Sequence, residues 1–417
     1  MSPAAAAPRI AIIGAGSSGL AAARVFSRNG LQPIVLEKDK YVGGIWKYEP
    51  NSKTRPMYRG LRTNLPKEIM AFREFPFPKP QDPSFLPQEK VQEYLEAYRD
   101  HFDLTKYIHY GCEVTKVEVL KNQKSLISPE SEVWPQIRLE WKDSINTEHE
   151  TKRAEVFDVV CICNGHYSRP ALATIPGLND HFRGSIMHSI EYDNPADFKG
   201  QTVLCVGGRA SGSDLARELA PFCKHVYLSD STCPNVETQG NITWVPATIA
   251  VNKDDGSIVF DKSPDVTPTV DCIIFCTGYD YEFPFIHDPE ILQCQPGERR
   301  VTPLFHQLWH AQYPTIAFLG IPHSVVPFPE VELQAEAIHA QFENCNFPSQ
   351  KERTKSAQKD ATSGGCKDNG RVPQDTHYLG PCQWDYERTL AKLAGIFDQK
   401  IDNFITTNQV CFLCLLL

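Results

Sequence analysis

The feature that most constrains the fold is a glycine pattern near the start of the chain. The run Gly14–Gly19 fits GxGxxG, and it lies between a short apolar segment, Arg9–Ile13, and a segment with helical spacing, Leu20–Arg28. A second apolar segment follows at Pro33–Leu36. This order predicts a strand, a helix and a parallel strand, so an α/β fold with a helix-covered parallel sheet is expected.

Each residue type in this turn suits a dinucleotide. Gly14 permits a tight turn, Gly16 lets the backbone approach a pyrophosphate, and Gly19 lets the helix pack closely on the strand. The helix N-terminus offers N–H groups and a partial positive charge to the phosphates. Glu37, at the end of the second strand, can accept hydrogen bonds from ribose hydroxyls. The candidate ligand residues of the turn are Gly14, Ala15, Gly16, Ser17, Ser18 and Gly19. A glycine-rich turn that only packs well is the alternative interpretation.

A second, degraded copy of the pattern lies in the middle of the chain. Residues 207–212 stand between an apolar segment, Thr202–Val206, and a helix expected over Asp214–Ala220. Arg209 occupies a position where glycine is usual, so a structural repeat that has lost its ligand stays open as an alternative. An acid, Asp230, again follows the next strand. The candidate ligand residues of this copy are Gly207, Arg209, Ser211, Gly212, Ser213 and Asp214.

Two dinucleotide units on one chain of 417 residues indicate two domains and electron transfer from a nicotinamide to a flavin. The net charge of −9 argues against a nucleic-acid partner. The 14 cysteines are scattered, which predicts reduced thiols rather than a disulfide framework. The terminal apolar run Val410–Leu417 is too short for a transmembrane segment, which needs about twenty residues. A cytoplasmic protein is therefore expected, and peripheral membrane contact through the tail stays open.

Five features together resemble the flavin-containing monooxygenase (FMO) family, closest to its shorter animal and plant members. They are GAGSSGL with Glu37 and the later Gly43-Gly44-Ile45-Trp46; Leu61–Pro66; Phe182–Tyr192; the strand ends at Cys163 and Cys276; and His377-Tyr378-Leu379-Gly380 with Gln383-Trp384. The run Phe182–Tyr192 satisfies every fixed position of the family's pattern FxGxxxHxxx(Y/F), and is the most specific of the five. The similarity spans about Arg9 to Gly395.

The resemblance implies two Rossmann-like domains, with an NADPH domain inserted into a discontinuous FAD domain. FAD would be bound by residues 1–168 and 284–417, and NADPH by residues 169–283. The polar stretch 348–376 is expected to be a mobile surface loop, and the last helix is expected to end near Phe397. The resemblance adds these cofactor-binding residues: Gly44, Ile45, Trp46, Thr63, Asn64 and Leu65.

The resemblance also implies the reaction. NADPH reduces the flavin, oxygen adds at flavin C4a, and the hydroperoxide transfers one oxygen to a soft nitrogen or sulfur of a small amine or sulfide. Asn64 matches an asparagine that the family places beside flavin and nicotinamide, so it is the candidate catalytic residue. A turn residue before Pro66 is the alternative for Asn64. His188 is expected to be structural rather than an acid or base. Asp230 would repel a 2′-phosphate, which weakens the expected NADPH preference unless Arg209 or Lys224 compensates.

Other functions stay open beside this one. An altered second turn is compatible with an NADPH oxidase that releases only peroxide, or with a non-catalytic cofactor-binding relative. Baeyer–Villiger oxygenases usually carry Trp where this chain has Tyr192, so that reaction is less favoured. No metal site is expected. Substrate identity and a homodimer cannot be decided from the sequence.

Overall fold

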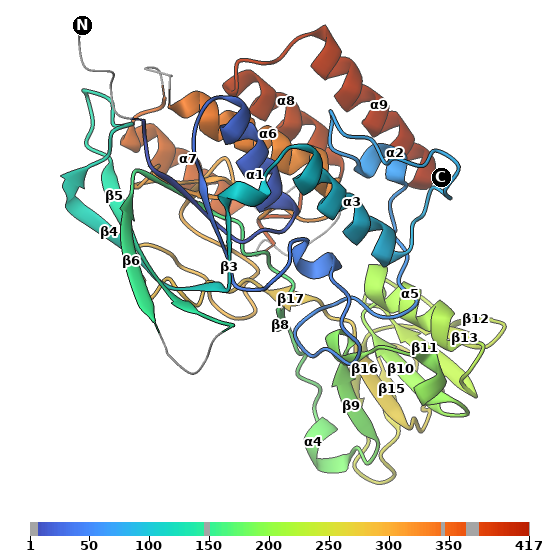
Figure 1. The fold of residues 1–417 in the computed structure, drawn as a ribbon. Helices are drawn as coiled ribbons and strands as arrows, with labels where there is room; N and C mark the ends of the chain where they lie inside the picture. The colour runs from blue at the N-terminus through green and yellow to red at the C-terminus, as the bar shows by residue number, and fades with distance from the viewer. Residues whose placement is uncertain (1–6, 146–150, 343–346, 364–374, 417) are drawn as a thin grey trace, which may run out of the picture. The chain divides into compact units, whose positions relative to one another are not determined.

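The computed structural model describes residues 7–145, 151–342, 347–363 and 375–416, and the chain divides into two compact units (Figure 1). Unit 1 comprises residues 1–47, 65–166 and 281–417, and unit 2 comprises residues 48–64 and 167–280. The cuts at 166/167 and 280/281 lie close to the domain limits expected from the sequence. Segment 48–64 was expected in the first domain, but its contacts place it in unit 2.

Unit 1 is built on a seven-stranded sheet of order β18-β19-β20-β7-β1-β2-β3. The parallel strands are β20 (Ile316–Phe318), β7 (Val159–Ile162), β1 (Ile10–Ile13), β2 (Ile34–Glu37) and β3 (Ile108–Tyr110). The antiparallel edge is formed by β18 (Leu304–Phe305) and β19 (Trp309–His310). The central strands are buried on both faces, which is why they read as continuous apolar runs.

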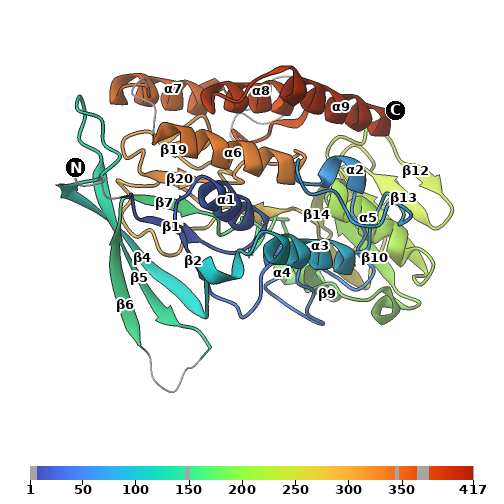
Figure 2. The same ribbon diagram turned by 45° about the horizontal axis from the view of Figure 1, so that its top comes forward.

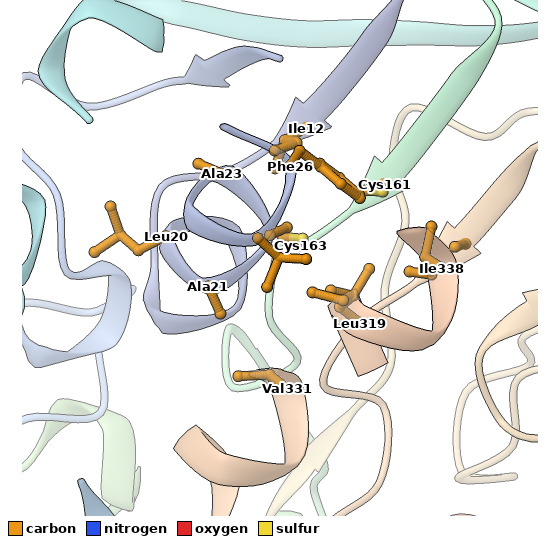
Figure 3. Packing of buried hydrophobic residues seen from close by; sticks show 14 of the residues in the cluster. Ile12, Leu20, Ala21, Ala23, Phe26, Cys161, Cys163, Leu319, Val331 and Ile338 are labelled. Atoms are coloured by element: carbon orange, nitrogen blue, oxygen red, sulfur yellow. The ribbon is translucent and has the colours of Figure 1, made fainter. Parts of the chain in front are cut away.

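Helices cover this sheet on one side. The helices of unit 1 are α1 (Ser17–Arg28), α2 (Lys67–Met70), α3 (Gln88–His101), α6 (Pro327–Gln341), α7 (Gln350–Ser363), α8 (Gln383–Leu393) and α9 (Gln399–Leu416). In Figure 2, α6 lies between α1 and the layer that contains α8 and α9. Figure 3 shows Phe26 of α1 beside Cys161 of β7, and both belong to one buried cluster that also contains Ile338 of α6. Small alanine side chains on α1 let α6 approach closely.

A separate antiparallel sheet in unit 1 contains β4 (Cys112–Lys124), β5 (Pro135–Asp143) and β6 (Lys152–Phe157). It occupies the polar region where hairpins were expected. Buried and partly exposed residues alternate along β5, as in a sheet with one covered face.

The prediction of a loop over residues 348–376 is wrong for residues 350–363, which form α7. Residues 364–374 lie outside the described part of the chain. The helix begins with a local signal: the backbone N–H and hydroxyl of Ser349 both donate to Glu352 Oε2, at 2.9 and 2.7 Å. The buried Arg353 then fixes α7 by donating to the Ala311 carbonyl and to Glu132.

The prediction that the last helix ends near Phe397 is also wrong. Helix α8 ends at Leu393, and a further helix, α9, spans Gln399–Leu416. Gly395 has a φ of +68°, a left-handed conformation that ends the first helix and allows the second to begin. Among the described residues, no helix has the length and apolar character needed to cross a membrane.

Unit 2 has a six-stranded sheet of order β12-β13-β11-β10-β16-β9. Its strands are β12 (Glu237–Gln239), β13 (Ile242–Val245), β11 (His225–Ser229), β10 (Thr202–Val206), β16 (Cys272–Phe275) and β9 (Ser185–His188). Helix α5 (Ala210–Leu219) follows β10 and begins earlier than the expected Asp214. Smaller elements are β8 (Arg169–Pro170) with β17 (Tyr279–Asp280), β14 (Thr248–Val251) with β15 (Ile258–Phe260), and α4 (Leu178–His181). The sheet is parallel except for β12, which pairs antiparallel with β13, so unit 2 is a second α/β unit.

Most cysteines that the structure describes are free thiols, including Cys161 and Cys163 at β7 and Cys205 in β10. Cys382 is the exception, because it is disulfide-bonded. The expectation of reduced thiols therefore fails at this position, just before α8.

Candidate cofactor-binding site

The first glycine turn connects β1 to α1, and two of its glycines are required by backbone packing. Gly14 has a φ of +101°, and a Cβ there would lie 2.6 Å from the carbonyl oxygen of Cys163. A Cβ at Gly19 would lie 1.9 Å from the Gly14 carbonyl oxygen. These contacts hold the turn against the end of β7 and bring α1 close to β1.

The Gly43-Gly44 segment lies directly on this turn. The Gly43 N–H donates to the Ala15 carbonyl at 3.0 Å, and a Cβ on Gly44 would lie 3.2 Å from Gly16 Cα. Gly16 is the N-cap of α1 and carries no capping side chain. Two glycines therefore leave backbone exposed beside the helix N-terminus, an arrangement that fits the pyrophosphate of a dinucleotide.

Gln92 of α3 contacts the glycine pair, and sequence reasoning did not select it. Its Nε2 donates to the Val42 carbonyl at 2.9 Å, and a Cβ at Gly43 would lie 2.1 Å from its Oε1. Gln92 is buried although it is polar, and the sequence signal for this was its place beside Val91 and Leu95 on the buried face of α3. Ile45 and Trp46 continue the segment in a short 3-10 helix, and Trp46 packs partly buried against the core of unit 1.

Glu37 fastens the turn to the end of β2. Its Oε2 accepts the Ala15 N–H at 2.6 Å, and its Oε1 accepts the Asp39 N–H at 2.9 Å. Burial raises the pKa of this carboxyl, while the two N–H donors act in the opposite direction. The carboxylate is therefore positioned beside the turn, and its contact with a ribose stays a prediction.

The second turn, between β10 and α5, repeats the first one in detail. Gly207 has a φ of +111°, and a Cβ there would lie 2.6 Å from the Cys276 carbonyl oxygen. A Cβ at Gly212 would lie 1.7 Å from the Gly207 carbonyl oxygen. The backbone positions that require glycine are thus preserved in the degraded copy.

Arg209 fits this turn without strain. It is the N-cap of α5 with φ −75° and ψ −166°, close to the φ −73° and ψ −171° of Gly16. Any residue adopts this extended conformation, so the arginine leaves the turn intact. Gly208 is the position that the sequence did not select: a Cβ there would lie 2.2 Å from Asp230 Oδ2. Asp230 also accepts the Thr232 N–H at 2.8 Å.

The remaining candidates lie in the first turns of the two helices. Ser17 and Ser18 open α1, and Ser211, Ser213 and Asp214 lie in α5. The Ser213 hydroxyl donates to the Gly208 carbonyl at 2.8 Å, which closes the second turn. Burial raises the pKa of the Asp214 carboxyl.

The segment Thr63-Asn64-Leu65 lies where the chain passes from unit 2 to unit 1. Thr63 is buried, Leu65 packs partly buried against the core of unit 1, and the Asn64 side chain is exposed. An exposed amide is accessible to a ligand, and the role of Asn64 stays a prediction.

His188 has the structural role expected of it. Its Nδ1 accepts the Ile190 N–H at 3.2 Å, so its Nε2 carries the proton and donates to the Gly278 carbonyl at 3.0 Å. Burial lowers the pKa of this imidazole. Nδ1 therefore caps the short turn that follows β9, and Nε2 joins the end of β9 to the segment after β16.

The family model described as FMO-like, flavin-binding monooxygenase-like, matches residues 7–241 and 233–404. The chain belongs to the flavin-containing monooxygenase family. This FMO is 34% identical over 410 residues to flavin-containing monooxygenase FMO GS-OX-like 2 of Arabidopsis thaliana, covering 92% of this chain and 84% of the relative. It is 32% identical to FMO GS-OX5 of the same plant, covering 93% and 84%.

Solved structures show the same fold for this FMO. S-allyl-L-cysteine S-oxygenase from Allium sativum superposes with a TM-score of 0.83 at 29% identity, covering 97% of this chain and 93% of that one. Tmm from Pelagibacter sp. strain HTCC7211 superposes with a TM-score of 0.76 at 22% identity, covering 96% and 90%. The FMO is thus a flavin-dependent monooxygenase of a family whose cofactors are FAD and NADPH.

Proposed function

We propose that this FMO uses NADPH to transfer one oxygen atom from O₂ to a soft nitrogen or sulfur atom of a small molecule. The observation that carries the proposal is the repeated turn geometry. The glycine constraints at Gly14 and Gly19 recur at Gly207 and Gly212, so each unit offers a dinucleotide turn.

The turn of unit 1 is the proposed FAD site. Gly16 and Gly44 would face the pyrophosphate at the N-terminus of α1, and Glu37 would lie beside the adenosine ribose. When bound, FAD supplies the oxygen-activating chemistry, and the protein contributes orientation and exclusion of water.

The turn of unit 2 is the proposed NADPH site. Arg209 stands at the N-terminus of α5, where its guanidinium can pair with a phosphate. Asp230 lies against the same turn through Gly208, where its charge opposes a 2′-phosphate. Coenzyme preference would therefore depend on the balance of these two side chains.

Asn64 is the proposed catalytic residue. Its neutral amide can donate and accept hydrogen bonds at once, so it can orient the nicotinamide and a flavin-side oxygen without adding charge. The Asn64 residue is exposed, which fits contact with a ligand.

Sulfur oxygenation is supported by one relative, because the 29% identical Allium protein is named as an S-oxygenase. The test is a panel of tertiary amines and sulfides, with NADPH loss, O₂ consumption, peroxide and product measured together. Oxygenated product in step with NADPH loss is expected. Peroxide alone would assign an oxidase instead, and neither product nor NADPH loss would assign a non-catalytic binding protein.

A further inference from the structure

A cluster of ionisable side chains lies in unit 1 apart from the glycine turn. We call His166, His323, His377 and Asp375 the histidine cluster. His323 Nε2 lies 2.6 Å from Asp375 Oδ1. Tyr281 lies between two other members, with its ring centroid 5.0 Å from that of His166 and 5.3 Å from that of His377. The Tyr281 hydroxyl donates to the Ile321 carbonyl.

Strand register places this cluster on the ligand-binding edge of the sheet. Phe318 of β20 pairs with Ile162 of β7, and Ile162 pairs with Ile13 of β1. His323 follows β20 and His166 follows β7, so both lie at the carboxyl edge from which the glycine turn also leaves. Ligands of parallel sheets bind at this edge.

The order of the strands gives the direction of the cofactor. Glu37 follows β2, on one side of β1, whereas β7 and β20 lie on the other side. A dinucleotide whose ribose lies beside Glu37 would extend its flavin end away from β2. The histidine cluster therefore lies toward the reactive end of the proposed FAD site.

Two histidines of the cluster are held in the neutral form. His377 Nε2 accepts the Val301 N–H at 2.8 Å, so its Nδ1 donates to Gln307 Oε1 at 3.1 Å. Burial lowers the pKa of His377 to about 3, and His323 adds to this effect. Burial likewise lowers the pKa of His166 to about 3. Neither ring is suited to accept a proton near neutral pH.

His323 differs from both of these. Its side chain is 17% exposed, whereas that of Asp375 is 4% exposed. The carboxylate fixes a proton on His323 Nε2 and leaves Nδ1 as the acceptor atom, with the Ser324 hydroxyl 3.3 Å away. The ring of Tyr378 packs at 5.7 Å. A partly accessible imidazole oriented by a buried carboxylate is the arrangement of a general base.

The backbone around the pair is held firmly. The His323 N–H donates to the His377 carbonyl at 3.0 Å, and the Leu379 N–H donates to the His323 carbonyl at 3.2 Å. Ser324 and Gln307 are non-glycine residues with φ values of +58° and +54°. Such conformations persist where the surroundings enforce them, and they concentrate at functional sites.

We propose that His323, positioned by Asp375, accepts the proton that an ammonium substrate must lose before its nitrogen is oxygenated. This inference rests on the proposed monooxygenase function. At neutral pH an alkylamine is protonated and its nitrogen has no free electron pair. Transfer of that proton to His323 Nδ1 gives a neutral amine and an imidazolium, which then releases the proton to water. The nitrogen electron pair then forms the N–O bond as the O–O bond of the oxygen donor breaks, and the second oxygen atom of O₂ leaves as water. A thioether needs no such step.

The test compares a tertiary amine with a thioether of the same chain length. In His323→Gln at pH 7, kcat/KM for the amine is expected to fall about 100-fold, while that for the thioether changes by less than about twofold. The amine deficit should shrink toward about pH 10, because solution then supplies the neutral amine. Asp375→Asn should show the same pattern with a smaller loss. His287→Gln, on an exposed histidine of unit 1, is the matched control and should change neither substrate.

Each other outcome contradicts the inference in a recognisable way. Equal losses with amine and thioether, at every pH, would make His323 a structural residue. Wild-type protein that oxygenates thioethers but no amine would overturn the inference and leave the monooxygenase function standing. Wild-type protein that oxygenates neither would overturn both. FAD content reports whether His323→Gln is folded. If His323→Gln has lost its FAD, the same comparison is made with Asp375→Asn.

Discussion

At the scale of single residues, some positions of the two turns require glycine for their backbone conformation or packing, and others do not. Gly14 and Gly207 have left-handed φ values and press against a neighbouring strand end. Gly16 and Arg209 do neither, although the sequence pattern gives the same weight to all four positions. Protein packing alone does not require glycine at position 16, because a Cβ there would lie 3.7 Å from Gly44 Cα, an ordinary contact distance. This agrees with the proposal that the position is kept small for a pyrophosphate.

Gly16→Val provides the first prediction. A β-branched side chain at this N-cap would project toward Gly44, into the space assigned to the pyrophosphate. The purified variant is expected to fold but to lose at least about nine-tenths of its FAD, an affinity loss of more than about 1.4 kcal/mol. Flavin absorbance per mole of protein measures this, and circular dichroism reports folding. A folded variant with full FAD occupancy would show that FAD binds elsewhere.

The second prediction concerns coenzyme choice. Arg209→Ala should narrow the preference for NADPH over NADH, and Asp230→Ser should widen it, each by about tenfold in the ratio of kcat/KM values. The reason is that one side chain attracts a 2′-phosphate and the other repels it. Equal ratios in wild type and both variants would exclude this account. Lys224→Ala is the matched control, because Lys224 precedes β11 whereas Asp230 follows it, at the other end of the strand.

The third prediction concerns Asn64. Asn64→Asp adds a charge and Asn64→Ala leaves room for water, so both should lower product yield far more than FAD content. NADPH oxidation is expected to continue, with most of the reducing equivalents recovered as hydrogen peroxide. The measurement is the ratio of peroxide to oxygenated product. A ratio unchanged from wild type in both variants would mean that Asn64 is a turn residue.

At the scale of elements, the strands and helices that flank the turns could be predicted because their period and their glycine signals are local. Strand β10 was expected over Thr202–Val206, and the structure has it there. Helix α7 was missed because its polar composition resembles that of a loop. Its start was nevertheless encoded in the spacing of Ser349 and Glu352. Burial of Arg353, which anchors α7, depends on residues distant in sequence and could not be predicted.

The interface between α6 and α8 gives a prediction for stability. Glu330 and Glu387 are fully buried there, and among the described residues Glu330 Oε2 and both Glu387 carboxyl oxygens have no hydrogen-bond partner. Burial raises the pKa of Glu387 to about 8, and burial with the neighbouring Glu387 raises that of Glu330 well above its ordinary value. The Glu387 carboxyl is therefore mostly protonated in the folded protein at neutral pH.

Since the folded pKa of Glu387 lies above its unfolded value, its contribution to stability is present at low pH and is lost as the pH rises to about 8. The free energy of unfolding should fall by about 1.4 kcal/mol per pH unit between about pH 5 and 8 because of this group. Glu387→Gln should remove that slope. Urea denaturation of the wild type and Glu387→Gln at pH 5.5 and 7.5 measures this slope. Glu93→Gln, at an exposed position of α3, is the control. An identical slope in Glu387→Gln would contradict the assignment.

At the scale of the whole molecule, the sequence predicted two dinucleotide units and close limits for the second one. It did not place segment 48–64 in unit 2, because that segment lacks any periodic pattern and joins unit 2 by tertiary contacts alone. The histidine cluster could not be predicted from the sequence either. His377 was selected only by family resemblance. Its proximity to His166 comes from tertiary packing, because both rings contact Tyr281, and no local sequence signal records that.

The match between the two turns has a consequence for how coenzyme preference can be changed. The carbonyl oxygens of Cys163 and Cys276 press on the first glycine of each turn, so the protein fold itself fixes the shape of both turns before any ligand arrives. The free-energy cost of ordering the turn, about 1–2 kcal/mol per residue, is therefore met during folding and does not reduce ligand affinity. Position 209 carries none of this constraint. If Arg209 contacts the coenzyme as proposed, substitutions at position 209 should change coenzyme preference without disturbing the backbone of the turn.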